Sequence, residues 1–413
     1  MNLAIQIEHY LPQQPLQLIK TISKQANQSG HRAYLVGGVV RDMILGYANF
    51  DLDLVIEGNA VKLAQQIAKA SQAKLITHPR FGTAKLNYSD FSLDMTTARG
   101  ETYARPGALP DVTPGTIKDD LFRRDFSINA MAISLNKNTY GELIDPYHGK
   151  RDLERRFIRI LHPESFRDDS TRIIRATRYE QRLGFKIEPQ TFQLLKQNIP
   201  IIDTLSGDRI RHELELIFRE EYPEFAINRL KQLGVLQRIN SSLKGDGWIA
   251  SKFDKARSLR KPNQLPSLYL CLLVYPLQVE NNERFIQRLN IPTRLSRVLR
   301  DTLRLKSQLH LLDKPSIKHS EIYYFLHEYK PLAIQANVIA SDSPAVHSSL
   351  ELFLTKLRYV RTTLTGKELI NLGIPAGPQL GEILQALHAA KLNNEVKTGA
   401  EEKRLALLLK SYV

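Results

Sequence analysis

The chain has 413 residues, of which 42% are hydrophobic and 24% are charged, as in ordinary globular proteins. Its 58 lysines and arginines outnumber its 43 aspartates and glutamates, and the formal charge of +15 favours a polyanionic partner, nucleic acid before a membrane surface; a generally basic surface is the alternative. The single cysteine, Cys271, excludes an internal disulfide and a cysteine-based zinc site, and it favours a reducing, cytoplasmic location.

The first part of the chain predicts a helical lead-in over residues 1–30, because the apolar residues of "LQLIKTISKQA" recur at helical spacing. These residues lack the basic start and long apolar core of a signal peptide. From 31 to 160 we expect a helix in "AVKLAQQIAKAS" and strands in "AYLVGG", "DLDLVIEG", "GTAKLNY", "FSLDMTT", "AMAISL" and "ELIDP". From 161 to 413 helices dominate, and no apolar run reaches the roughly 18 residues of a transmembrane helix. The sequence therefore predicts an α+β head followed by an all-α remainder.

Three aspartates lie in the predicted strands. Alternation along a strand puts Asp51 and Asp53 on one face of "DLDLVIEG", and Asp94 joins them if "FSLDMTT" lies beside it. Such carboxylates suit divalent cations, and Mg²⁺ binds one or two carboxylates together with substrate phosphates. Three of them suit two-metal phosphoryl or nucleotidyl transfer. The alternatives are solvent-facing aspartates and an aspartate-nucleophile phosphatase, although "GYANF" is not the apolar strand that a phosphatase needs before its first aspartate.

A glycine pair precedes these aspartates in "YLVGGVVRDMILG", which predicts a strand, a turn and a short helix that ends at Gly46. Glycines allow close backbone approach to an anion, and free N–H groups at a helix start bind phosphate. Gly37 and Gly38 are therefore candidates for holding a triphosphate, with Arg41 adding charge.

Four motifs in order carry a specific resemblance: "LVGGVVRDMILG…DLDLV", "RRDFSINAMAI", "LIDPYHGKRDL" and "DDSTRIIRATRYEQRLGF". Together they resemble the class II tRNA nucleotidyltransferase/poly(A) polymerase family, whose members include CCA-adding, CC-adding and A-adding enzymes. The resemblance implies a polymerase-β-like nucleotidyltransferase head, with a small mixed sheet and helices, on an all-α neck, body and tail. It assigns 31–160 to the head, 161–225 to the neck and 226–413 to the body and tail.

The same resemblance implies roles for individual residues. Gly37 and Gly38 would hold the triphosphate, and Asp51 and Asp53 would bind the catalytic Mg²⁺ ions, with Asp94 as a further catalytic candidate. The remaining nucleotide contacts would come from Arg124, Asp125, Asn129, Asp169 and Arg172.

Asp169 and Arg172 can also be argued physically as readers of the incoming base. Three residues apart on a helix, they would be neighbours, and a carboxylate with a guanidinium can satisfy the pairing edge of cytosine or adenine. The alternative is an ordinary surface ion pair. Further along the expected helix, phosphate contact is favoured over a solvated basic face for Arg175, Arg178 and Arg182.

Two further segments bear on the substrate. The basic stretch from Arg294 to Lys306 could carry the acceptor stem of tRNA by shape and charge. The segment from Gly100 to Gly115 is a loop by composition and resembles that of relatives that add only part of the CCA end.

The resulting prediction is template-independent transfer of CMP or AMP from CTP or ATP to the 3′ end of tRNA, in the cytoplasm. The alternatives are a poly(A) polymerase, a non-catalytic RNA-binding relative and a small-molecule nucleotidyltransferase.

Overall fold

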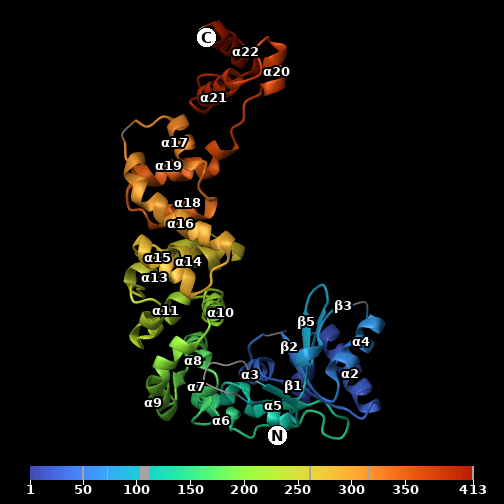
Figure 1. The fold of residues 1–413 in the computed structure, drawn as a ribbon. Coiled ribbons are helices and arrows are strands. Elements are labelled where there is room, and N and C mark those ends of the chain that lie inside the picture. The colour runs from blue at the N-terminus through green and yellow to red at the C-terminus, as the bar shows by residue number, and fades with distance from the viewer. Residues whose placement is uncertain (49–50, 72, 103–110, 260–261, 315, 412–413) are drawn as a thin grey trace. The chain divides into compact units, whose positions relative to one another are not determined.

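The computed structural model describes residues 1–48, 51–71, 73–102, 111–259, 262–314 and 316–411 (Figure 1). The chain forms two compact units. The first comprises Met1–Glu213 with Gln232–Arg238, and the second comprises Leu214–Lys231 with Ile239–Val413.

A seven-stranded sheet forms the centre of the first unit, in the order β3-β4-β5-β2-β1-β8-β9. Strands β2 and β5 pair in parallel, and the other neighbours in the sheet pair antiparallel. Every strand predicted from the sequence is confirmed; the additional strand is β3, an edge strand whose side chains are never fully buried, so it carries no strong apolar pattern. The strands are β1 Arg32–Val36, β2 Leu52–Glu57, β3 Lys74–His78, β4 Thr83–Asn87, β5 Ser92–Thr97, β8 Ala132–Ser134 and β9 Leu143–Ile144.

Helices cover the sheet and extend its core. The lead-in forms α1 (Ala4–Tyr10) and α2 (Gln13–Gln28), and α2 packs on β1 and on α4 (Ala60–Ser71), which in turn packs on β4 and β5. An apolar cluster of buried side chains contains both Val55 of β2 and Leu121 of α5 (Ile117–Phe122), so α5 also packs against the sheet. Helix α3 (Gly38–Leu45) begins at the second glycine of the pair, and α6 (Gly149–Arg155) begins inside the third motif.

The segment predicted as a loop between Gly100 and Gly115 is partly strand, so that prediction is wrong at both ends. Strands β6 (Arg99–Thr102) and β7 (Asp111–Pro114) form an antiparallel ribbon. The ribbon depends on cross-strand hydrogen bonds, which a composition rich in Gly and Pro does not reveal. Residues 103–110 lie outside the described residues.

The fourth motif departs from the prediction at its start. Helix α8 runs from Thr171 to Leu183 and ends, as predicted, at left-handed Gly184, but it does not include the preceding acids. Asp168 closes the short α7 (Ser165–Asp168), and Asp169 is extended, with φ −139° and ψ 99°. The carboxylate of Asp169 accepts the N–H and hydroxyl of Thr171, which holds the chain out of the helix just before α8.

The rest of the first unit is mostly helical. A short parallel pair, β10 with β11, interrupts the helices. Strand β11 lies in the part predicted to be all helical, so that prediction is wrong there; two residues are too few to show the alternation of a strand. These elements are β10 Phe157–Ile158, β11 Lys186–Ile187, α9 Pro189–Asn198, and also α10 Gly207–Ile217 and α12 Val235–Ile239, whose last residues belong to the second unit.

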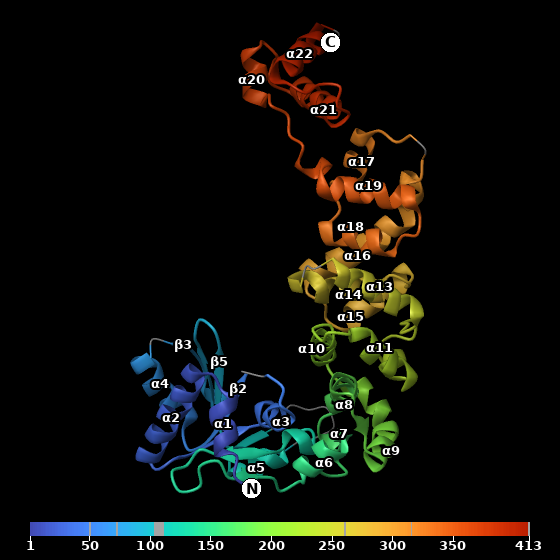
Figure 2. The same cartoon turned by 180° about the vertical axis from the view of Figure 1, so that it is seen from behind.

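The second unit contains no strand among its described residues, as predicted. Figure 2 shows α14, α16 and α18 packed together, and a further apolar cluster lies under α20, α21 and α22. No helix in the described part of the chain is both long and apolar enough to cross a membrane. The main helices are α11 Pro223–Gln232, α13 Gly247–Ser258, α14 Leu265–Val274, α15 Val279–Arg288, α16 Thr293–Gln308, α17 His319–Leu326, α18 Pro331–Ala340, α19 Pro344–Thr355, α20 Gly366–Asn371, α21 Pro378–Leu392 and α22 Gly399–Ser411.

Candidate nucleotidyl-transfer site

The glycine turn connects β1 to α3 and faces charged side chains. Gly37 has φ +75°, and a Cβ atom there would lie 2.6 Å from Nη1 of Arg124 and 3.8 Å from Oδ2 of Asp53. Glycine is therefore required both by the backbone conformation and by the close approach of Arg124. Gly38 begins α3 and lines the adjacent cavity.

Asp53 and Asp94 lie side by side, because β2 and β5 pair in parallel with these two residues as register partners. Burial raises the pKa of Asp53 to about 6, with further contributions from the charges of Asp51 and Asp94, although Arg124 and Lys85 oppose the rise. Asp94 itself accepts a 2.8 Å ion pair from Lys85 on β4. The condition under which the sequence placed Asp94 with Asp53, that the two strands are neighbours, is met.

Asp51 lies outside the strand, since β2 begins at Leu52, and Asp51 is exposed. No three acidic, histidine or cysteine side chains of the described residues form a ready-made metal site. The arrangement instead fits an ion held by one or two carboxylates that completes its oxygen shell with substrate phosphates. The desolvation and the neighbouring carboxylates that raise the pKa of Asp53 are the physical reason to expect a cation there.

Asp120 of α5 positions two arginines. Its buried carboxylate accepts a 2.7 Å bond from Arg123 and a 3.0 Å bond from Arg124. Arg123 also donates to Glu101 of β6 at 3.1 Å. Both guanidinium groups are thereby fixed before any ligand binds.

The motif "RRDFSIN" forms a buried polar network with α3. Asn129 donates to Asp125 at 3.0 Å and accepts a 2.6 Å bond from Arg41, which also binds Asp42 through two nitrogens. Burial raises the pKa of Asp125, but the charge of Arg175, 2.8 Å away, and the bond from Asn129 bring it below its usual value. Arg41 is 2% exposed, so direct contact with a phosphate would require exchanging these bonds.

The two predicted base-reading residues lie near each other but form no ion pair on a helix. Asp169 accepts a 2.6 Å bond from Arg209 of α10. Arg172 donates to the backbone carbonyls of Ser165 at 3.1 Å and Arg123 at 2.7 Å. These carbonyls hold the guanidinium of Arg172 at a defined position.

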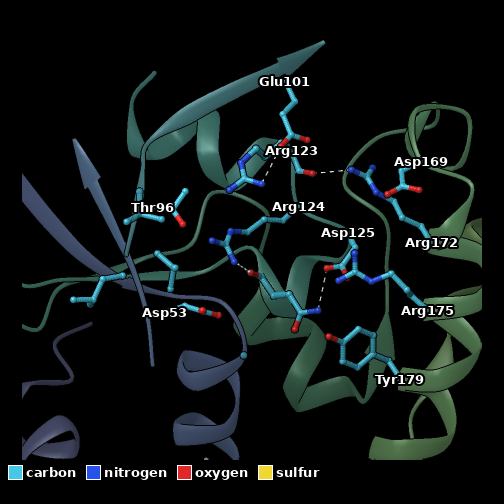
Figure 3. A pocket seen from close by; sticks show the side chains of 15 residues that line it. Asp53, Thr96, Glu101, Arg123, Arg124, Asp125, Asp169, Arg172, Arg175 and Tyr179 are labelled. Atoms are coloured by element: carbon cyan, nitrogen blue, oxygen red, sulfur yellow. Dashed lines mark hydrogen bonds and ion pairs between the residues drawn. The ribbon is translucent and has the colours of Figure 1, made fainter. Parts of the chain in front are cut away.

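One cavity of about 410 Å³ collects most of the predicted residues (Figure 3). Figure 3 shows Asp53 and Arg124 on the sheet side and Arg172 and Arg175 on the α8 side. The predicted residues that line the cavity are Gly38, Asp53, Arg124, Asp125, Asn129, Asp169, Arg172 and Arg175. Those that lie outside its lining are Gly37, Arg41, Asp51, Asp94, Arg178 and Arg182.

Four polar lining residues were not predicted: Thr96, Glu101, Arg123 and Tyr179. Arg123 adjoins Arg124 in the motif, and Tyr179 lies two helical turns after Arg172, so both had a signal in the sequence. Glu101 had none, because only the β6–β7 ribbon brings it to Arg123.

Comparison with known proteins agrees with this architecture. The model of the poly A polymerase head domain matches residues 33–159, and that of a probable RNA-binding site of polymerase A matches 184–245. The chain is 33% identical, over 98% of its length, to an A-adding tRNA nucleotidyltransferase of Geobacter sulfurreducens, of which it covers 48%, about half. It is 34% identical over 98% of its length to the A-adding tRNA nucleotidyltransferase of Halalkalibacterium halodurans, of which it covers 94%.

Solved structures give the same result. A CCA-adding enzyme in its apo form superposes with a TM-score of 0.81 at 30% identity, with 99% of each chain covered. The Thermotoga maritima CCA-adding enzyme complexed with tRNA superposes with a TM-score of 0.75 at 29% identity, covering 99% of this chain and 98% of that one. The chain therefore belongs to the tRNA nucleotidyltransferase/poly(A) polymerase family.

Proposed function

We propose that this protein is a nucleotidyltransferase that adds CMP or AMP, from CTP or ATP, to the 3′ end of tRNA without a nucleic acid template. One observation carries the proposal: Asp53 and the base-reading candidates Asp169 and Arg172 line one cavity of mononucleotide size, and Asp94 is the register partner of Asp53. The relatives' names, which specify tRNA nucleotidyltransferases, support the substrate.

The reaction would join the terminal 3′-hydroxyl of tRNA to the α-phosphate of the nucleotide, and the bond from that phosphate to pyrophosphate would break. Mg²⁺ held by Asp53 and Asp51 would supply positive charge to the phosphates and acidify the hydroxyl. Arg124 and Arg123, already fixed on Asp120, would bind the triphosphate. Asp125 and Asn129 would contact the ribose and phosphates, with Arg41 keeping Asn129 in place. Positioning and electrostatics would then supply most of the rate.

Base selection would rest on Asp169 and Arg172. The backbone carbonyls of Ser165 and Arg123 fix Arg172, and Arg209 fixes Asp169, so hydrogen-bonding groups of both kinds are oriented before the base arrives. Preorganised donors and acceptors discriminate well because a wrong base leaves them unpaired. Arg175 and Arg178 would add charge beside them.

The tRNA would extend onto the neck (161–225) and onto the body and tail (226–413). In α16, Arg300 pairs with Glu283, and Arg304 pairs with Asp301 and lies over the ring of Tyr329. Arg294 instead lines a cavity of about 920 Å³ with Lys330 and Arg358. This cavity is the strongest candidate in the second unit for binding the RNA backbone.

The proposed activity is partial-end addition, with AMP as the favoured nucleotide because two relatives at 33% and 34% identity are A-adding enzymes. The lone, buried Cys271 supports a cytoplasmic location.

Purified protein should be offered tRNA that ends before CCA, after one C and after CC, with CTP and ATP alone and together, and the products sequenced. Extension of only the CC form with ATP means A addition, arrest at CC means CC addition, and completion means CCA addition. Repeated AMP addition to many RNAs would indicate a poly(A) polymerase, and no transfer to any end would refute the proposal.

A further inference from the structure

A second, larger cavity lies in the first unit, away from the one that contains Asp53. Its volume is about 790 Å³, and its walls come from α4, the short helix η1 (Pro79–Phe81) and the ribbon β6–β7. The two cavities share no lining residue. The second is therefore a distinct space, large enough for a mononucleotide.

The charge in this cavity has one sign. Lys62, Arg80 and Arg99 line it, and no carboxylate does among the described residues. Lys62 and Arg80 are exposed and make no ion pair with any residue that the structure describes. Two cations that open into a concave site without a carboxylate partner favour an anionic ligand.

An aromatic ring stands beside these cations. Phe81 is 49% exposed, and the guanidinium of Arg80 lies 5.9 Å from the centroid of its ring. Its backbone is held, because Arg99 donates to the carbonyl of Phe81 at 2.8 Å and Gly82 closes the turn with φ +61°. Exposed aromatic rings flanked by cations bind nucleobases by stacking while the cations bind phosphate.

Arg99 also connects the two cavities. It donates to Glu101 at 3.2 Å, Glu101 accepts from Arg123 at 3.1 Å, and both Glu101 and Arg123 line the first cavity. An anion that bound Arg99 and drew it away from Glu101 would therefore disturb one of the two carboxylates, Glu101 and Asp120, that hold Arg123 in the candidate active site.

We propose that this cavity is a second binding site for a nucleotide unit, with the base stacked on Phe81 and the phosphate bound by Lys62 and Arg80. The same chemistry could come from a free nucleotide or from an unpaired end of an RNA strand. The inference does not depend on the proposed catalytic function, because none of its residues lines the first cavity.

The test is photolabelling of the full-length protein with 8-azido-ATP and, separately, with a CCA trinucleotide that carries 8-azidoadenosine at its 3′ end. Labelled peptides would be mapped by mass spectrometry. Phe81→Ala and the double variant Lys62→Ala/Arg80→Ala remove the stacking surface and the cations in turn. Lys69→Ala, which removes an exposed cation from the same helix outside the cavity, is the matched control.

We expect labelling of the peptides that line this cavity, reduced in both cavity variants. For Phe81→Ala the reduction should be about fivefold or more, which is the low end of what base–aromatic stacking contributes. Lys69→Ala should be labelled like the wild type. Labelling by the mononucleotide identifies a free nucleotide as the ligand, and labelling by the trinucleotide alone identifies an RNA end. No labelling here, or equal labelling in the cavity variants, overturns the inference, whatever the transfer assay shows.

Discussion

At the scale of single residues, Asp53 is a carboxylate whose negative charge is destabilised by its surroundings. It is half-buried beside two other aspartates, and desolvation raises its pKa to about 6, so its charged form needs a positive partner. A residue held in this way at a cavity wall is a functional candidate on physical grounds.

Asp53→Asn should reduce nucleotidyl transfer by about 100-fold or more, because the amide keeps the shape but cannot hold a divalent cation. Incorporation of labelled ATP or CTP into tRNA measures the loss. Asp90→Asn, at an exposed position in the same unit, should retain activity. Wild-type transfer by Asp53→Asn would refute the metal assignment.

Asp125 serves stability as well as the proposed chemistry. Removing it by Asp125→Ala leaves the positive charge of Arg175 and the amide of Asn129 without their buried acceptor. The free energy of unfolding should fall by about 1–3 kcal/mol. Urea denaturation of the variant and of Asp90→Ala provides the comparison, and equal stability of both variants would contradict a structural role for Asp125.

At the scale of elements, charged side chains of α8 and α10 interact with each other. Glu213 of α10 is 6% exposed, and burial raises its pKa above the usual value although Arg175 and Arg178 of α8 oppose the rise. The charged carboxylate is therefore less stable in the folded protein than in the unfolded chain, which is a linkage between pH and folding.

Glu213→Gln tests this linkage, since glutamine mimics the protonated acid. A carboxyl group whose pKa is higher in the folded protein than in the unfolded chain stabilises the fold when it is protonated. This stability is fully present below the pKa of the unfolded chain and is lost as the pH rises through the pKa of the folded protein. The melting temperature of the variant should therefore match the wild type near pH 4 and exceed it increasingly towards pH 8. The exposed Glu142→Gln is the control, and a wild type that is more stable than Glu213→Gln at pH 8 would contradict the expectation.

At the scale of the whole molecule, part of the excess positive charge of the chain is gathered at one cavity of the second unit. Arg294, Lys330 and Arg358 share one cavity, with the exposed ring of Tyr359 beside them, whereas Arg300 and Arg304 are paired with acids. Net charge alone could not have distinguished these arginines.

Arg358→Glu should raise the KM for tRNA about tenfold and leave kcat nearly unchanged, because it alters RNA binding far along the chain from the residues of the reaction. The dependence of tRNA binding on salt should also become weaker. Arg284→Glu makes the same charge change at an exposed position outside the cavity and is the control. Equal effects of the two variants would mean that only overall charge matters.

The sequence by itself determined the elements and the local motifs. Helical and strand periodicities located α4, β2 and β5, and the spacing of glycines and acids identified Gly37 and Asp53, because these signals depend on neighbours in the chain. Asp125 was assigned only through the family resemblance of its motif. The sequence identified Asp169 as a candidate base-reading residue but wrongly placed it on a helix. The hydrogen bonds from Thr171 to its carboxylate keep its backbone extended, and helical periodicity does not reveal them.

Only the tertiary structure decided which distant residues meet. The register of β2 with β5 places Asp94 beside Asp53, and the β6–β7 ribbon carries Glu101 to Arg123 and Arg99 to the turn at Phe81. These contacts are set by strand pairing between segments that are far apart in the chain, and no local pattern encodes such pairing. The motifs thus identified most of the polar residues that line the first cavity, whereas no motif indicated the second, which only the packing of α4, η1 and the β6–β7 ribbon forms.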